Sequence, residues 1–383
     1  MKLKKIILCF VPHYLPGFRS GGVARSIANF VDQLGDEFDI RIICSDRDLN
    51  DSKSYSNIKI DSWNVVGKAK VFYASKKTIS FFGIKDFLSQ AEYDVIYFNS
   101  FFSFRFTILP LFVSIFGSLK KKTFVISARG EFSEGALQIK KIKKFFFIFI
   151  VKYLGLYKNL NWQASSILEL EDIKKNFGEI ARKINIVPDL ISTKVFSYKK
   201  KNKRDSKNLK IIFLSRISPM KNLDFLIRVL TRVSIPLKLS IYGHKEDANY
   251  WNYCKKIIKK LPSNIKTYIG KEIYHKKIFQ YFQKNDLFAF PTRGENFGHV
   301  VLESLSVGTC VILSDKTPWR SKHPAIEAIP LDEDAWVLAI EEWSNLRKQD
   351  FINRRNLALK YFYKIKIENK TYLELNKKLF YDI

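Results

Sequence analysis

Short apolar runs alternate with amphipathic helical patterns along almost the whole of this 383-residue chain. Most of the runs are continuous, as is typical of strands that are covered on both faces. The clearest helical pattern covers residues 22–34, where Val23, Ile27 and Phe30 fall on one face. This βα alternation predicts parallel sheets in a doubly wound α/β fold. The expected strands are Ile6–Val11, Asp39–Cys44, Val71–Tyr73, Val95–Phe98, Thr123–Ser127, Ile184–Val187, Lys210–Ser215, Leu237–Tyr242, Ile265–Ile269, Leu287–Phe290 and Cys310–Leu313.

A polar, strongly basic and non-periodic stretch at 198–209 divides the chain into two halves of similar texture. We therefore predict an N-terminal Rossmann-like domain at 1–197 and a C-terminal one at 210–355. The last stretch, 356–383, is expected to be helical. Two such domains facing one another would leave an interdomain cleft at the carboxyl ends of their strands, where ligands usually bind.

The net charge of +29 is the strongest compositional signal. Basic chains attract nucleic acid, anionic membranes or anionic ligands, although a lysine cluster is as often a solvated surface. The lysines are scattered and no known nucleic-acid-binding motif is present, so no specific nucleic-acid partner is expected. The four cysteines lack metal-ligand spacing. No apolar run approaches the roughly 20 residues that span a bilayer, so we expect a soluble or peripheral protein.

Two glutamates mark the strongest motif, which runs from Phe290 to Leu305. Glu295 is expected in a loop after a strand, and Glu303 on a helix that begins near Gly298. Carboxylates accept hydrogen bonds from pairs of hydroxyls, so this arrangement suits recognition of a sugar and a ribose. Gly298 lacks a Cβ and allows a ligand close to the backbone, and the amides that begin a helix suit a phosphate.

Two further motifs each lie between an expected strand and an expected helix. Arg216 follows a strand end and Lys221 lies five residues on, where two cations can clamp a diphosphate. Taken alone, such a pair is more often two surface cations. Gly21 and Gly22 precede the first helix and can form a loop that approaches an anion, although a glycine pair there is usually a turn.

In this order the three motifs resemble those of the retaining glycosyltransferases of family four, also described as glycosyl transferases group 1, which have the GT-B fold. The two glutamates match the E-x7-E signature of that family, the two cations its diphosphate clamp, and the glycine pair its N-terminal glycine loop. The resemblance covers nearly the whole chain. It extends through Tyr97–Ser103, Ala128–Leu137, Trp162–Ser166, Ser314–Trp319 and Ile329–Trp336.

The resemblance implies a role for each motif. Glu303 would hold the ribose hydroxyls of a nucleotide-sugar donor, and Glu295 the hydroxyls of the transferred sugar. Arg216 and Lys221 would stabilise the leaving nucleoside diphosphate, a task that falls to them because the family needs neither a metal nor a cofactor. The implied catalytic residues are thus Glu295, Arg216 and Lys221. The implied donor-binding residues are Gly21, Gly22, Arg216, Lys221, Glu295, Asn296, Phe297, Gly298 and Glu303.

The same resemblance implies a retaining reaction by front-face attack, with the leaving phosphate accepting the proton of the acceptor. It also implies that the N-terminal domain takes the acceptor and that the C-terminal helix, 356–383, packs back on that domain. Many relatives carry a histidine near the reacting carbon, where this chain has Asn99 and Arg129. His13 and Glu131 are further acceptor-side candidates, although a lone histidine is more often structural. The usual Pro-Asn turn reads Pro188-Asp189 here.

The segment 128–156 combines a lysine cluster with the aromatic run 145–151. Such a surface can sit on an anionic membrane that holds a lipid-linked acceptor. The alternative is an ordinary core helix with a lysine-rich solvent face. We therefore expect a glycan or lipid-linked acceptor, and a cytoplasmic enzyme that is peripheral on the inner face of the cytoplasmic membrane, serving bacterial surface polysaccharide synthesis.

Three rival functions remain open. A nucleotide-sugar epimerase of GT-B shape would keep the fold but need no acceptor. A basic nucleic-acid-binding protein is favoured by the charge alone. A catalytically inactive relative that serves as a scaffold would not need both glutamates and both clamp cations.

Overall fold

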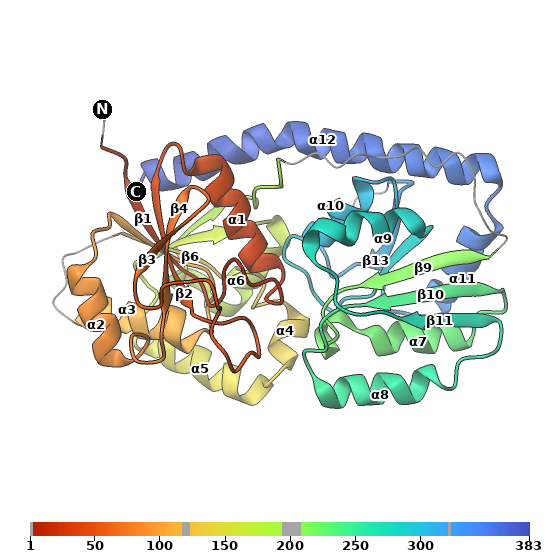
Figure 1. Ribbon diagram of the computed structural model, residues 1–383, viewed down its shortest axis with the longest axis horizontal. Coiled ribbons are helices and arrows are strands. Elements are labelled where there is room, and N and C mark those ends of the chain that lie inside the picture. Colours follow the sequence, from red (N-terminus) through yellow and green to blue (C-terminus); the bar gives the residue numbers. More distant parts are fainter. Residues whose placement is uncertain (1–2, 117–122, 194–207, 321–322) are drawn as a thin grey trace. The chain divides into compact units, whose positions relative to one another are not determined.

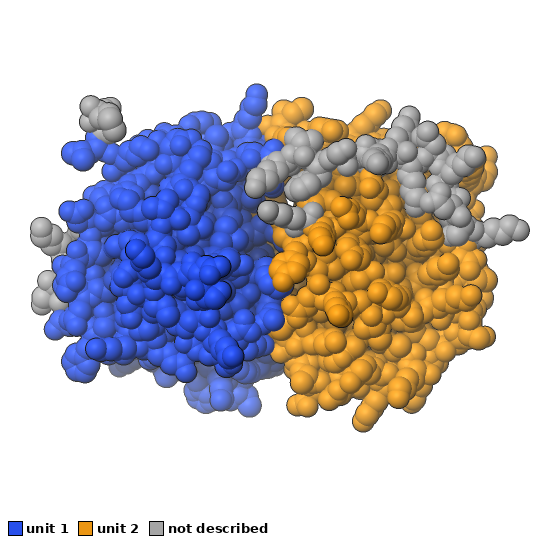
Figure 2. All heavy atoms as spheres, in the orientation of Figure 1, with its two compact units in different colours: residues 1–193, 369–383 blue, residues 194–368 orange. Residues whose placement is uncertain are grey.

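The computed structural model describes residues 3–116, 123–193, 208–320 and 323–383 (Figure 1). Its contacts divide the chain into two compact units (Figure 2). Unit 1 comprises residues 1–193 and 369–383, and unit 2 comprises residues 194–368. Most of the expected linker at 198–209 lies outside the described residues, and its last residue, Leu209, already belongs to a strand.

Unit 1 is built on an eight-stranded sheet of order β3-β4-β2-β1-β5-β6-β7-β8. All neighbouring strands are parallel except β3, which pairs antiparallel with β4. The strands are β1 (Ile6–Phe10), β2 (Asp39–Ser45), β3 (Trp63–Val66), β4 (Ala69–Ala74), β5 (Val95–Phe98), β6 (Thr123–Ser127), β7 (Asn161–Ala164) and β8 (Lys183–Ile186). The helices are α1 (Gly22–Leu34), α2 (Phe81–Gln90), η1 (Phe104–Ile108), α3 (Leu109–Phe116), α4 (Glu134–Gln138), α5 (Lys141–Tyr153), α6 (Ile167–Phe177) and η2 (Gly178–Ile180).

Two apolar clusters form the core of unit 1, and they hold alternate residues of strand β1. Because alternate strand residues point to opposite faces, the clusters cover the two faces of the sheet. One cluster takes inward residues from α2, α3, α5 and α6, and includes the contact of Phe101 with Tyr157, whose ring centroids lie 4.5 Å apart. The other takes residues from α1 and the C-terminal helix.

Unit 2 is built on a six-stranded sheet of order β11-β10-β9-β12-β13-β14, in which every pair of neighbours is parallel. The strands are β9 (Leu209–Leu214), β10 (Leu237–Tyr242), β11 (Ile265–Ile269), β12 (Leu287–Phe290), β13 (Cys310–Ser314) and β14 (Ile326–Ile329). The helices are η3 (Pro219–Lys221), α7 (Leu223–Thr231), α8 (Ala248–Ile258), η4 (His275–Lys277), α9 (Ile278–Lys284), α10 (His299–Leu305) and α11 (Glu333–Asn345).

The C-terminal helix α12 (Lys348–Tyr381) has 34 residues and begins eight residues before the expected 356. Its first part belongs to unit 2, where the buried Arg355 donates to the carbonyls of Asn285, at 3.2 Å, and Val307, at 3.4 Å. Its last part belongs to unit 1, where the Phe380 ring packs 5.2 Å from that of Tyr97. Unit 2 therefore extends beyond the expected domain boundary at 355.

The eleven expected strands and the first helix are confirmed, with ends that shift by at most two residues. Three short strands were not expected, namely β3, β7 and β14. Each has four residues and includes a polar side chain. In both units the parallel strands bring the loops at their carboxyl ends to one edge of the sheet, and the predicted site residues follow those ends.

Candidate functional site

Arg216 follows β9 in a loop that continues the pairing of the sheet. The amide of Ile217 donates to the carbonyl of His244 at 2.7 Å, so the loops after β9 and β10 run side by side. Gly243, with φ 151°, lies so close that a Cβ there would meet the Ser215 carbonyl oxygen at 1.7 Å. Only glycine fits at position 243. Because Gly243 has no side chain, the two loops can approach closely, and Arg216 lies next to the loop after β10.

The guanidinium of Arg216 pairs with Glu246, with 2.8 Å between Nη1 and Oε1. Both side chains are about one-third exposed, at 34% and 28%. Beside them, His244 Nδ1 lies 2.7 Å from Glu272 Oε1. A cluster of four polar side chains therefore lies at the carboxyl ends of β9, β10 and β11. Within it, the carboxylate of Glu246 orients Arg216, the arginine of the predicted diphosphate clamp.

Lys221 and Glu295, which lie 74 residues apart in the chain, form an ion pair. Lys221 Nζ is 2.8 Å from Glu295 Oε2, and the side chains keep only 11% and 18% of their exposure. Burial alone would raise the pKa of the Glu295 carboxyl. The charge of Lys221, its hydrogen bond, the Asn296 amide and the charge of Arg216 together hold that pKa below its ordinary value. Glu295 is therefore ionised at neutral pH.

Gly298 precedes α10 with φ 79° and ψ 53°, a left-handed conformation that favours glycine. A Cβ there would lie 2.9 Å from Trp319 Nε1 and 3.2 Å from Glu295 Cγ. The same Trp319 Nε1 donates to the carbonyl of Phe297 at 2.6 Å. The tryptophan thus fixes the backbone of the loop that carries Glu295, Asn296 and Phe297.

Glu303 lies on α10, which has seven residues, and its carboxylate meets a histidine that sequence reasoning missed. His275 Nε2 is 2.8 Å from Glu303 Oε1, and the Glu303 side chain is only 10% exposed. His275 begins η4 in the loop after β11. The contact holds one carboxylate oxygen and thereby orients the carboxyl group.

The structure brings Lys221 and Glu295 into contact and places Arg216 near enough for its charge to act on Glu295. Sequence reasoning missed three residues that contact the predicted site residues: Glu246 contacts Arg216, His275 contacts Glu303, and Trp319 contacts Phe297. Glu246 and His275 have a signal that could have found them, because each is a polar residue shortly after a strand that ends at the ligand-binding edge. No sequence signal connects Trp319 to Gly298.

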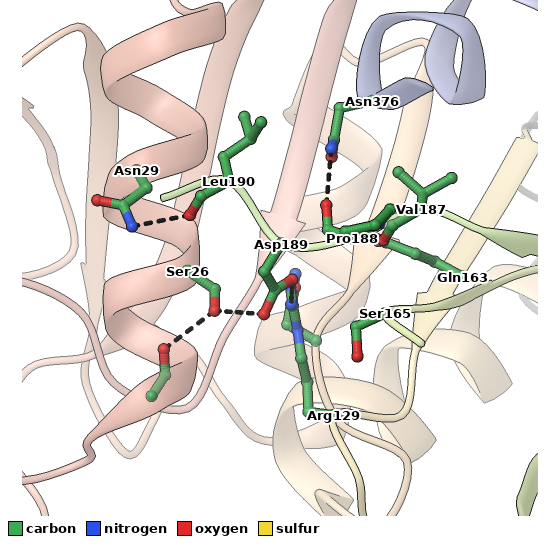
Figure 3. Close-up of polar contacts among 12 residues, drawn as sticks. Ser26, Asn29, Arg129, Gln163, Ser165, Val187, Pro188, Asp189, Leu190 and Asn376 are labelled. Carbon is green, nitrogen blue, oxygen red and sulfur yellow. Dashed lines mark hydrogen bonds and ion pairs between the residues drawn. The ribbon is translucent and has the colours of Figure 1, made fainter. Parts of the chain in front are cut away.

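In unit 1, Arg129 is the centre of a buried polar network (Figure 3). Its guanidinium forms an ion pair with Asp189, and both side chains are only 4% exposed. It also donates to Asn99 Oδ1, at 2.6 Å from Nη2, and to the hydroxyl of Tyr97 at 2.8 Å. Asp189 in turn accepts a hydrogen bond from Ser26 of α1 at 2.7 Å. The network ties together the segments that follow β5, β6 and β8 and the start of α1.

This network changes the interpretation of three residues. Arg129 and Asn99 were expected near the acceptor, and the structure shows that their side chains contact each other inside unit 1. A contact of either residue with the acceptor stays a prediction. Asp189, in place of the usual asparagine, supplies the charge that the buried Arg129 requires, because an unpaired buried cation is costly. The Pro188-Asp189 turn therefore also supplies the ion-pair partner of Arg129.

The other acceptor-side candidates occupy the same edge of unit 1. The Glu131 carboxylate accepts from the amides of Phe101 and Phe102, at 2.7 and 2.8 Å, and so orders the loop after β5. His13 Nδ1 lies 3.0 Å from the carbonyl of Arg47. A contact of either residue with an acceptor stays a prediction.

Gly21 and Gly22 differ in whether their surroundings require glycine. Gly21 has φ 75° and ψ −128°, which other residues rarely adopt. Gly22 begins α1, and a Cβ there would meet no described atom within 4 Å. Packing within the described chain therefore does not require glycine at position 22, which suits the approach of a ligand to this backbone.

Three comparisons place this geometry among known proteins. Residues 195–322, which include Arg216, Lys221, Glu295 and Glu303, match the sequence model of the family described as Glycosyl transferases group 1. A Klebsiella pneumoniae protein described as an uncharacterized 41.2 kDa protein in the cps region is 24% identical over 304 residues. That match covers 77% of this chain and 78% of the Klebsiella protein.

Solved structures match over the whole length of the chain. Sucrose-phosphate synthase from Thermosynechococcus elongatus aligns with a TM-score of 0.72 at 13% identity and covers 100% of both chains. HepE from Anabaena in complex with UDP-glucose aligns with a TM-score of 0.70 at 14% identity, over 97% of this chain and 99% of HepE. Trehalose-6-phosphate synthase OtsA aligns with a TM-score of 0.69 at 11% identity, over 99% of each chain. The chain therefore has the GT-B fold, and its segment 195–322 carries the sequence pattern of the group 1 glycosyltransferases.

Proposed function

We propose that this protein is a retaining, metal-independent glycosyltransferase that moves a hexosyl residue from a nucleotide-sugar donor to a glycan or lipid-linked acceptor. The observation that carries the proposal is the contact of Lys221 with Glu295 beside the left-handed Gly298, inside the segment that matches the group 1 family. A buried cation suits a phosphate and a buried carboxylate suits sugar hydroxyls, and a phosphorylated sugar carries both kinds of group.

The donor side of the proposal assigns one task to each group of unit 2. Lys221 and Arg216 hold the diphosphate, Glu295 accepts hydrogen bonds from sugar hydroxyls, and Glu303 accepts them from the ribose. His275 orients Glu303 for that task. The structures of Anabaena HepE with UDP-glucose and with UDP support a nucleotide-sugar donor, since that protein has the same fold.

The proposed reaction breaks the bond between the anomeric carbon and the donor phosphate oxygen, and the electron pair of that bond stays on the phosphate. The acceptor oxygen forms its bond on the same face of the sugar, and its proton passes to the departing phosphate. Negative charge therefore develops on the diphosphate in the transition state. Cations held in place before the reaction stabilise this charge most effectively. The two cations, each held by a carboxylate, suit this task.

The acceptor side of the proposal rests on unit 1 and on the Klebsiella relative. The name of that relative places it in a cps region, which supports a role in the synthesis of a capsular or other surface polysaccharide. We propose that the acceptor is a growing glycan or a lipid-linked sugar, and that the enzyme works in the cytoplasm on the inner face of the membrane. None of the described helices is both long and apolar enough to cross a bilayer.

The first test is calorimetric titration with UDP-, GDP-, ADP- and dTDP-sugars. The protein is expected to bind one nucleotide clearly, and Glu303→Ala is expected to weaken that binding by about tenfold or more, because a hydrogen bond to a charged group contributes roughly 1.5–3 kcal/mol. Glu342→Ala, which removes an exposed carboxylate from α11, is the matched control and should bind as the wild type does.

Lack of binding across the whole panel would overturn the proposed donor site. With the donor identified, the anomeric configuration of the product separates retention from inversion. Activity that persists in excess chelator supports the metal-independent reaction, and activity that a divalent cation restores would contradict it.

A further inference from the structure

Helix α5 presents an apolar face to solvent. Val151 is its one fully buried residue, and Phe147 and Ile148 pack partly against the core. The remaining large apolar side chains are between 51% and 85% exposed. We call them the α5 apolar face: Ile142, Phe145, Phe146, Phe149, Ile150 and Tyr153.

These side chains form one stripe rather than a scatter. At 100° per residue, the six positions fall within an arc of about 140° on the helix surface. The inward residues Phe147, Ile148 and Val151 occupy the opposite side. The helix is therefore apolar on both faces, and the core covers only one of them. An ordinary core helix with a lysine-rich solvent face, the alternative that the sequence left open, would lack the outer stripe.

Lysines border the stripe on both sides. The same helical spacing places Lys141 and Lys152 along one border and Lys143 along the other. The whole stretch from 135 to 168 contains six lysines and no aspartate or glutamate. Aromatic and aliphatic side chains with flanking lysines are the pattern of helices that lie in the plane of an anionic membrane surface.

Two other helices on the same face of the sheet, α2 and α3, also expose aromatic side chains. The inward residues of α2, α3 and α5 belong to the same core cluster, so the three helices cover the same face of the sheet of unit 1 (Figure 1). Phe82 of α2 is 75% exposed and Phe116 of α3 is 64% exposed. Phe81 and Phe112 join the two helices, with ring centroids 6.5 Å apart. The stripe on α5 is one contiguous group of exposed large apolar side chains on a single helix, and such groups mark interaction surfaces.

We propose that the α5 apolar face is a membrane-docking surface that inserts its aromatic side chains among anionic lipids while its lysines contact the headgroups. The charge argues for this occupant over a second copy of the chain, because two copies would bring their lysine borders together. The proposal deepens the proposed function, since it rests on a lipid-linked acceptor for its purpose. Helix α5 begins ten residues after Glu131, so the docking surface and the acceptor-side loop of unit 1 are adjacent in the chain.

The test is flotation of the full chain with phosphatidylcholine vesicles, with and without phosphatidylglycerol, at low and high salt. The wild type should float with the anionic vesicles, and salt should weaken the binding. The double variant Phe145→Ser/Phe149→Ser should lose about tenfold in partitioning for each phenylalanine removed. Lys141→Gln/Lys143→Gln should lose the preference for anionic lipid.

Matched controls are available in unit 2. Leu338→Ser removes an apolar side chain that is 68% exposed on α11, and Lys255→Gln/Lys256→Gln removes two exposed lysines of α8. Both should float as the wild type does. Absence of flotation by the wild type, or equal loss in the controls, would overturn the proposal. So would a dimer in light scattering that the double phenylalanine variant abolishes without any lipid binding.

Donor titration of the same variants separates this proposal from the enzymatic one. If flotation fails and donor binding persists, the docking surface is wrong and the donor site stands. If flotation succeeds while no nucleotide binds, the docking surface stands and the proposed enzyme does not.

Discussion

The carboxylate of Glu295 is buried, and its charge depends on the ammonium of Lys221 at 2.8 Å. Lys221→Ala removes that cation and leaves the buried carboxylate with only the Asn296 amide and the charge of Arg216 to stabilise it. We expect the free energy of unfolding at neutral pH to fall by about 3 kcal/mol, the low end for breaking a buried pair, because both side chains retain some exposure. Urea unfolding measures this change. Donor affinity should fall in the same variant.

The stability difference between the wild type and Lys221→Ala should depend on pH in a defined direction. In the wild type the pKa of Glu295 is depressed, so its contribution to stability is present above the ordinary carboxyl pKa and is lost as pH falls through the folded value. In Lys221→Ala, burial meets less opposition and the pKa rises, so the variant gains relative stability as the carboxyl becomes protonated. The difference in unfolding free energy should therefore be largest at neutral pH and shrink in acid. A difference that stays constant with pH would contradict the assignment.

His275 is the second residue whose contact can be tested. Because it holds Glu303 Oε1 at 2.8 Å, His275→Ala should weaken nucleotide binding by about tenfold through loss of orientation of the carboxylate. His275→Gln keeps a side-chain donor and should recover part of that affinity. His323→Ala, at a histidine that stacks on Tyr361 of α12, is the control and should bind normally. Calorimetry with the identified donor decides, and full affinity in His275→Ala would show that Glu303 needs no such partner.

Residue types could be predicted here better than residue partners. The sequence suggests Glu295, Lys221, Arg216 and Glu303 as site residues because their spacing after strand ends resembles the motifs of a known family. It does not show that Arg216 meets Glu246 or that Glu303 meets His275, because the partners in each pair are 28 or more residues apart in the chain. For Arg129 it predicts a functional cation but misses the burial, which depends on Asp189 sixty residues away.

At the scale of elements, the loop between β12 and α10 depends on Gly298. Gly298→Ala adds the cost of a left-handed backbone, about 1–2 kcal/mol, and a Cβ within 2.9 Å of Trp319 Nε1. Gly155→Ala is the matched control, since Gly155 also has positive φ, 60°, at the end of a helix, but a Cβ there meets nothing within 4 Å. Urea unfolding should show the larger loss for Gly298→Ala, and only that variant should lose donor affinity. Equal losses, with donor binding intact in both, would show that the tryptophan does not fix the loop.

The strands also show which elements of the fold can be predicted from the sequence. Long apolar runs such as those of β9 and β10 are visible because both faces of the strand are buried. Strand β3 was missed because it lies at the sheet edge, where Val65 is 83% exposed. It pairs only with β4, to which a tight turn at Gly67 connects it. Strand β7 was missed because it carries the polar Asn161 and Gln163, whose burial is compensated by hydrogen bonds to Phe124 and Val187.

On the scale of the whole molecule, α12 is the element that belongs to both units. In unit 2 its Arg355 is buried beneath the carbonyls of Asn285 and Val307. In unit 1 its Asn376 donates to the carbonyl of Pro188 at 3.0 Å, next to the Asp189 that pairs with Arg129 (Figure 3). The C-terminus of the chain thus supports the polar network of unit 1, so loss of its packing should affect unit 1 and leave the donor-side contacts of unit 2 in place.

Phe380→Ala tests this division. The ring of Phe380 is fully buried against Phe30 and Tyr97, with centroids 5.4 and 5.2 Å away, so its removal leaves a cavity and should cost unit 1 about 3–5 kcal/mol. Ile367→Ala, at a position on the same helix that is 72% exposed, is the control and should change stability little. Hydrogen exchange should accelerate in β1 and β5 but not in β9 and β12, and calorimetry should show donor affinity unchanged. Because the ion pair of Lys221 with Glu295 and the contact of His275 with Glu303 both lie within unit 2, acceleration in all four strands together with loss of donor affinity would mean that the two units fold as one cooperative body.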